Sequence, residues 1–150
     1  MAIKYRGRDE EVRALGAFVA LQRAAESVEA ATQAEIAAAD LTQSRFGVLE
    51  ALHHLGPLCA AELSKKILRS KGNLTLVIEN LERDGLVARQ AREDDKRVKT
   101  VALTAKGRKV IGGMFPRHAR LIVKAMNALT KDEQDELKAL CRKLGKAQRP

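Results

Sequence analysis

The sequence is poor in aromatic residues, with no tryptophan, one tyrosine and three phenylalanines among 150 residues. Proteins that bind single-stranded nucleic acids stack the bases on aromatic side chains, so this scarcity argues against such a surface. Cysteine is also scarce: Cys59 and Cys141 lie far apart, without a CxxC or Cys/His ligand spacing. We therefore expect no disulfide framework, no metal site and no cofactor.

Long apolar runs are missing as well. No stretch approaches the roughly 20 apolar residues of a membrane helix, and the first residues, MAIKYRGRDEE, lack the apolar core of a secretory signal. These absences predict a cytoplasmic protein with no membrane partner. The sequence also has no GxGxxG, Walker or GxSxG motif and no nucleophile beside an evident base, so we do not expect an enzyme.

The charge is strongly unbalanced. Lysine and arginine number 28 against 19 aspartates and glutamates, which gives a formal net charge of +9. This excess favours a polyanionic partner such as nucleic acid, and the few aromatic residues favour duplex DNA over single strands. The chain is long enough, at 45% hydrophobic residues, to bury the core of a single domain.

The first half of the chain predicts three helices. Residues 9–39 contain no proline and much alanine, as is typical of one long helix. A second helix follows Thr42, its predicted N-cap, with Leu41 packing on Phe46, and it ends at Gly56-Pro57. Residues 60–67 form a short third helix.

The next segment predicts an amphipathic helix over residues 71–84, with Ser70 as N-cap and Gly85 as its stop. Four apolar residues recur at helical spacing and should be buried: Leu74, Val77, Ile78 and Leu81. The opposite face carries Gly72, Thr75, Leu76, Glu79 and Arg83. A three-residue link, 68–70, joins this helix to the preceding one. That is the spacing of a helix-turn-helix whose second helix enters the major groove.

After Gly85 the hydrophobic period changes. Residues 86–91 and 98–103 read as two strands joined by the charged stretch REDDKR, so they predict a β-hairpin. Thr104 then caps a helix over about 105–128, and a capping box of Thr130 and Glu133 begins the last helix. The last helix has an apolar stripe that needs a partner: Leu137, Leu140, Cys141 and Leu144. The predicted fold is mainly α with a small β-wing.

Two motifs carry a family resemblance. Asp95-Lys96-Arg97, followed by five residues and Leu103-Thr104, fits the signature D-x-R-x5-L-T, and residues 81–87, LERDGLV, fit L-E-x-x-G-L-V. Both lie where a winged helix-turn-helix places its recognition helix and wing. With helices on either side, the sequence resembles the MarR family of bacterial transcription regulators over nearly the whole chain. LTQSRFGVLEALHHLGPL and LRSKGNLTLVIENLERDGLV resemble most the subgroup that includes regulators responsive to phenols and quinones.

The resemblance implies a single domain, 1–150. Its winged helix-turn-helix lobe would span about 42–104, flanked by dimerisation helices at about 9–40 and 105–148. It also implies a homodimeric repressor on a palindromic operator in double-stranded DNA, with recognition helices one turn, about 34 to 36 Å, apart. The alternative function is a non-specific architectural DNA-binding protein without an effector response.

The resemblance places Arg97 in the minor groove and Asp95 in support of the wing. The chemistry agrees, because a narrow minor groove attracts a guanidinium and a carboxylate can orient it. Taken alone, these residues would be an ordinary solvated charge cluster at a hairpin tip. The full set of predicted DNA-binding residues is Ser70, Lys71, Asn73, Thr75, Leu76, Arg92, Lys96 and Arg97.

Leu76 departs from the family, many members of which carry arginine there. A leucine cannot pair with guanine, so it would contact a thymine methyl group or, alternatively, belong to a wider buried apolar face.

The family also implies a small aromatic or phenolic effector, bound between the dimer helices and the DNA-binding lobe. The candidate pocket residues are Phe46, Leu49, His53, Met114, Phe115 and His118, and core packing is the alternative for each. Cys59, near the start of the third helix, is a candidate for sensing oxidants, its alternative being a small buried hydrophobe. Cys141 should be unreactive within its apolar stripe.

Overall fold

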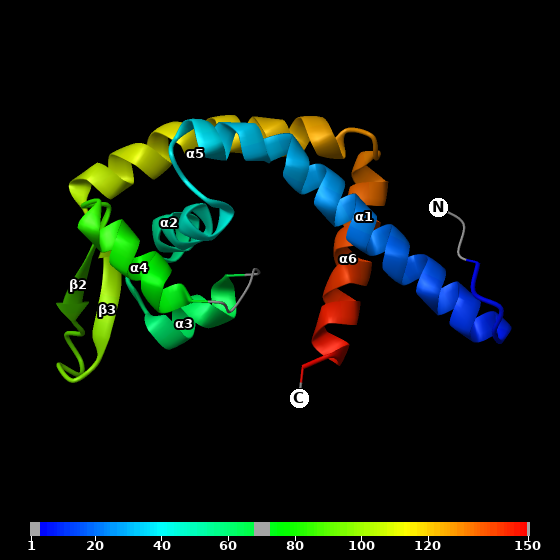
Figure 1. Cartoon of the computed structure of the whole chain (residues 1–150), viewed down its shortest axis with the longest axis horizontal. Coiled ribbons are helices and arrows are strands. Elements are labelled where there is room, and N and C mark those ends of the chain that lie inside the picture. The colour runs from blue at the N-terminus through cyan, green and yellow to red at the C-terminus, as the bar shows by residue number, and fades with distance from the viewer. Residues whose placement is uncertain (1–3, 68–72, 150) are drawn as a thin grey trace. The chain divides into compact units, whose positions relative to one another are not determined.

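The structure of the protein, a computed structural model, describes residues 4–67 and 73–149 (Figure 1). It is mainly helical with one small antiparallel sheet, which confirms the predicted fold class. The elements along the chain are α1 (Asp9–Ala38), α2 (Gln43–Leu55), β1 (Leu58–Cys59), α3 (Ala60–Lys66), α4 (Leu74–Arg83), β2 (Val87–Ala91), β3 (Lys99–Leu103), α5 (Ala105–Met126) and α6 (Lys131–Ala147). Among the described residues, no helix is both long enough and apolar enough to span a membrane.

The chain forms two compact units, and the first comprises Gln33–Ala119. In it, α2, α3 and α4 pack with the sheet around a shared apolar core, which includes the fully buried Leu49, Leu63, Leu81 and Ile111. The β2–β3 hairpin extends from this helical layer (Figure 1). Because this unit contains the predicted winged helix-turn-helix, we call it the DNA-binding lobe.

The sheet of the DNA-binding lobe has the order β1-β3-β2, with both pairings antiparallel. One row of paired residues crosses it, since Thr100 of β3 faces Cys59 on one side and Gln90 on the other. The hairpin of β2 and β3 is the predicted wing. The strand β1 was not predicted, because two residues are too few to show an alternating pattern.

Predicted caps determine where two helices of the lobe begin. The Thr42 side chain accepts a hydrogen bond from Arg45 N at 3.2 Å at the start of α2, and Gly56 ends that helix with a φ of 76°. Thr104 Oγ1 accepts from Gly107 N at 3.0 Å and donates to the Gly85 carbonyl at 2.6 Å. Thr104 therefore joins the start of α5 to the end of the recognition segment.

The predicted start of the recognition helix is wrong. The helix α4 begins at Leu74 and not at residue 71, because Asn73 has a left-handed backbone with a φ of 69° and occupies the N-cap position assigned to Ser70. Asparagine tolerates this conformation better than most residues. The predicted link and the side chains of Ser70 and Lys71 lie outside the described residues.

The second unit comprises Met1–Thr32 and Arg120–Pro150. Its helix α6 begins at the predicted capping box, in which Glu133 N donates to Thr130 Oγ1 at 3.3 Å and Thr130 N donates to Glu133 Oε2 at 2.7 Å. Large apolar side chains of this unit are exposed in the single chain: Val12, Leu15, Phe18 and Leu21 on α1, and Leu137, Leu140 and Leu144 on α6. The apolar stripe predicted on α6, Cys141 included, is therefore uncovered.

Candidate nucleic-acid interface

The recognition helix α4 is anchored by one face and exposed on the other. Ile78 and Leu81 are buried, and the two remaining members of the predicted apolar stripe pack against the same core. Thr75 and Leu76 are exposed in the first turn. Leu76 is 45% exposed, so the alternative in which it belongs to a buried apolar face does not hold in the single chain. The exposed first turn is available to a partner.

Asn73 lies at the N-terminal end of α4. Its side chain is exposed and makes no capping hydrogen bond, while its carbonyl accepts from Val77 N at 3.1 Å. The first N–H groups of a helix have no acceptor within the helix, and they form a favourable site for a phosphate. The N-terminal end of α4 therefore presents hydrogen-bond donors, from Asn73 and from these N–H groups.

The C-terminal end of α4 is fixed by residues that the sequence interpretation missed. Asp84, its C-cap, forms an ion pair with Arg45 of α2, and the Asp84 carbonyl accepts from Lys106 Nζ at 2.9 Å. Arg45 also donates to the Asp40 carbonyl at 3.3 Å. The direction of the recognition helix is therefore set by polar contacts with both α2 and α5.

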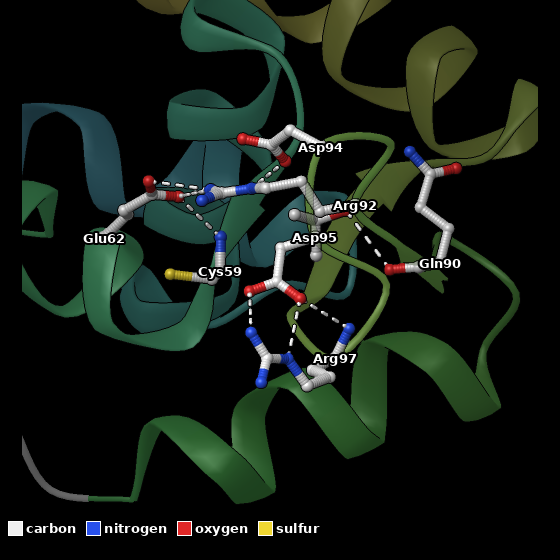
Figure 2. A network of polar contacts seen from close by, with 8 residues as sticks. Cys59, Glu62, Gln90, Arg92, Asp94, Asp95 and Arg97 are labelled. Atoms are coloured by element: carbon white, nitrogen blue, oxygen red, sulfur yellow. Dashed lines mark hydrogen bonds and ion pairs between the residues drawn. The ribbon is translucent and has the colours of Figure 1, made fainter.

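The tip of the wing is ordered by Asp95. Its carboxylate accepts hydrogen bonds from Arg97 N at 3.0 Å, from Nε at 3.1 Å and from Nη2 at 3.4 Å (Figure 2). These hydrogen bonds lower the pKa of Asp95, and those from the Arg97 side chain have the largest effect. The Arg97 side chain is nevertheless 92% exposed, and Lys96 beside it is exposed too. Asp95 thus orients a guanidinium that remains accessible.

Arg92 has a different environment from the other predicted DNA contacts. Its Nη2 donates to both carboxylate oxygens of Glu62 on α3, at 2.8 and 3.0 Å, and its Nε lies 3.7 Å from Asp94 Oδ1 (Figure 2). Glu62 Oε2 also accepts from Cys59 N at 2.8 Å. The hydrogen bond from the Cys59 N–H has the largest effect on the pKa of Glu62 and that from Arg92 the next largest; the pKa is lowered to about 2. Arg92 is therefore engaged within the lobe, and no sequence signal marked Glu62 as its partner.

The predicted pocket residues separate into core residues and a cluster of rings. Phe46, Leu49 and Met114 are buried in the core of the lobe. Ring centroids lie 4.6 Å apart for Phe46 and His118, and 5.9 Å apart for Phe115 and His118. Phe115 also lies near the exposed His53, at 5.9 Å, and near His54, at 4.5 Å. His54 was not among the predicted residues.

Several side-chain polar atoms of the lobe are buried without a hydrogen bond to any described residue: His118 Nδ1, both carboxylate oxygens of Glu35 near the end of α1, Gln43 Nε2 and Arg45 Nε. Glu35 has an ionic contact with Arg117, whose Nε lies 3.5 Å from Oε1. Buried polar atoms of this kind are costly unless a water or ligand satisfies them. The sequence alone did not indicate these buried polar groups.

Cys59 lies at the predicted place, before the first residue of α3. It is half-buried, and it belongs both to the edge strand β1 and to the N-cap of α3. Cys141 is exposed on α6. Among the described residues, no group of three or more potential metal ligands is clustered.

Comparison with known proteins extends this geometry. Residues 41–99 match the model of the MarR family. The Bacillus subtilis HTH-type transcriptional regulator YkoM is 35% identical over 138 residues, which cover 91% of this chain and 90% of YkoM. The structure of BpsR from Bordetella bronchiseptica, reported for the regulation of its DNA binding by 6-hydroxynicotinic acid, is similar with 28% identity and a TM-score of 0.73. This match covers 83% of the present chain and 89% of BpsR.

The fold is also shared with Sco3205 of Streptomyces coelicolor, a MarR family regulator solved in complex with DNA. The TM-score is 0.81 at 23% identity, and the match covers 98% of this chain and 93% of that one. The exposed recognition helix and the wing signature lie within or next to the matched residues 41–99. The chain belongs to the MarR family of transcriptional regulators.

Proposed function

We propose that the protein is a cytoplasmic, homodimeric repressor that binds a palindromic operator and leaves it when a small aromatic or phenolic effector binds. One observation carries the proposal. The lobe presents both an exposed recognition-helix turn and an exposed wing arginine that a carboxylate holds in place. Major-groove reading needs the first, and a minor-groove contact needs the second.

The residues then divide by role. Asn73, Thr75 and Leu76 face the bases of the major groove, with Leu76 against a thymine methyl group. Arg97 enters the minor groove, and Lys96 contacts phosphate. Asp95 holds the wing tip and makes no contact with DNA itself. Ser70 and Lys71, just before Asn73 in the sequence, contribute phosphate contacts.

Dimerisation is supported by the exposed apolar side chains of α1 and α6. Leucines 137, 140 and 144 lie on one face of α6 and are between 38 and 57% exposed in the single chain. A row of large apolar side chains in water is unfavourable, and a second copy of the same surface covers it by twofold symmetry. The homodimer then presents two recognition helices to two half-sites.

An aromatic effector is supported by the ring cluster around Phe115 and His118 in the DNA-binding lobe. The buried Glu35 carboxylate and His118 Nδ1 need hydrogen-bond partners, which a phenolic hydroxyl supplies. The related BpsR, whose DNA binding is regulated by 6-hydroxynicotinic acid, gives a precedent for a hydroxylated aromatic ring. Such an effector must favour a dimer geometry that no longer matches the operator.

The experiment is a selection of bound sequences from random duplex DNA, followed by titration of the selected duplex with phenols and quinones at fixed salt. A palindromic selected sequence, from which one class of compound releases the protein, supports the proposal. Uniform binding to all sequences would favour the architectural alternative. Cys59→Ser separates the two ways of sensing: a quinone response that survives this substitution excludes the thiol and leaves the ligand.

A further inference from the structure

The ion pair between Arg92 and Glu62 has no role in the scheme above. We infer that these two residues position the wing for DNA binding, and that Arg92, despite its charge and its place beside the wing tip, does not contact DNA. The inference rests on the proposed function, because it assigns the residues that hold the proposed minor-groove contact in place.

The ion pair joins the segments that follow the two outer strands of the sheet, β1 and β2, which do not pair with each other. The middle strand β3 separates β1 from β2, so the outer strands are about 10 Å apart, twice the usual strand spacing. Glu62 lies in the first turn of α3, directly after β1, and Arg92 directly follows β2. Figure 2 shows the Arg92 side chain reaching from the wing to Glu62. The ion pair therefore ties the start of the wing tip to the helical layer across the sheet.

The wing needs such a tie because its other restraints are weak. The paired residues of β2 and β3 end at Ala91 and Lys99, and β1 contributes only two residues to the sheet. Beyond that point the tip is closed by two backbone hydrogen bonds, from Arg92 N to the Val98 carbonyl at 2.9 Å and from Val98 N to the Asp95 carbonyl at 3.0 Å. A two-stranded ribbon twists readily. Arg92, at the first residue of the tip, is where a side-chain anchor restrains it most.

The surroundings of Arg92 argue against a phosphate contact. Its side chain is 32% exposed, compared with 92% for Arg97, and it donates to both oxygens of an ionised carboxylate. Cys59 N holds that carboxylate in place by a separate hydrogen bond of 2.8 Å. A phosphate that took Arg92 Nη2 from Glu62 would leave that carboxylate without its cation beside the DNA backbone. The Arg97 guanidinium is also paired with a carboxylate, that of Asp95, but its side chain is far more exposed to an incoming DNA backbone.

The two possible roles of Arg92 predict opposite changes in operator affinity for Glu62→Gln. If Arg92 positions the wing, the substitution weakens binding to the selected operator duplex by up to about fivefold for each wing of the dimer, the upper end for one partly exposed ion pair. If Arg92 contacts phosphate, the substitution strengthens binding, because it removes a negative charge and releases the arginine. Glutamine retains an acceptor for Cys59 N, so the start of α3 is preserved.

Glu82→Gln is the matched control. Glu82, on α4, pairs with Arg89 on β2 at 3.1 Å, and both side chains are about as exposed as Glu62. It is a helix-to-strand ion pair of the same kind, but it does not reach the wing tip. We expect Glu82→Gln to leave operator affinity unchanged or slightly raised. An equal weakening by both variants would overturn the inference.

Two combined variants test the mechanism. Arg92→Gln should add little in the Glu62→Gln background, because either substitution breaks the same contact, whereas independent effects would overturn the inference. The effect of Glu62→Gln should also shrink in an Arg97→Ala background, because the ion pair acts mainly through the position of Arg97. In the free protein, Glu62→Gln should speed hydrogen exchange at the Arg92 and Val98 amides while the amides of α4 keep the parent rates. Unchanged wing exchange would overturn the inference.

The affinity ratio of the parent protein for operator over random duplex tests the proposed function separately. A ratio near one rejects the proposed function, while the sign of the Glu62→Gln effect on the same random duplex still decides the role of Arg92.

Discussion

Replacing Arg97 with alanine removes an exposed cation of the wing and tests its proposed place in the DNA groove. Its guanidinium is 92% exposed and its polar contacts are those with Asp95, so the core of the lobe is unaffected by its loss. Each lost contact between a cation and DNA lowers the slope of log affinity against log salt concentration by about 0.9, or by about 1.8 for two wings in a dimer. Over a fourfold range of salt, the affinity ratio of parent to variant therefore changes by about 12-fold.

The assay is fluorescence anisotropy with one labelled operator duplex, from about 50 to about 200 mM potassium chloride, a range over which counterion release dominates. Lys131→Ala removes an exposed cation at the start of α6 and should retain the parent slope. Asp95→Asn keeps the arginine but loses its orienting charge, so binding should weaken without a fall in slope. Parallel lines for the parent and Arg97→Ala would refute the minor-groove assignment.

Three further predictions follow from the same geometry. Gly107→Ala places a methyl group 2.0 Å from the Leu86 carbonyl oxygen, and the overpacking, about 1 to 3 kcal/mol, should exceed the gain of about 1 kcal/mol in helix propensity; an unchanged urea midpoint would contradict it. The pKa of Glu62 is lowered from 4.5 to about 2, so its contribution to stability is present above pH 4.5 and is lost as the pH falls toward 2. Thermal melts of the parent and Glu62→Gln should accordingly differ above pH 4.5 and converge below it, and a constant difference would count against the ion pair. Leu76→Ala should leave stability nearly unchanged but relax sequence preference at one position of each half-site, and an unaltered selected sequence would remove Leu76 from the groove.

Local sequence signals predicted most of the lobe correctly. The spacing of Ile78 and Leu81 identified the buried face of α4, and Thr104 marked the start of α5. These signals work because helix periodicity and capping depend on residues a few positions apart. Asp95 and Arg97 are two positions apart at the tip of a hairpin, so their contact could also be predicted from the sequence.

Contacts between distant residues could not be predicted in this way. Glu62 and Arg92 are 30 positions apart, and Arg45 and Asp84 are 39 apart, so no periodic pattern connects either pair. Arg92 was therefore grouped with the DNA contacts on its charge alone. Asn73 shows a local limit: Ser70 as the predicted N-cap extends the helix back to residue 71, but the sequence does not reveal that the backbone of Asn73 lies in the left-handed region.

The proposed dimer reads two half-sites in fixed register. The most direct test is the affinity for the selected palindrome compared with the same duplex carrying five base pairs inserted at its centre, which turns one half-site by about half a helical turn. For the proposed dimer, this insertion should lower affinity toward the non-specific level, a loss of about a thousandfold or more at fixed salt. Equal affinity for the two duplexes would contradict it.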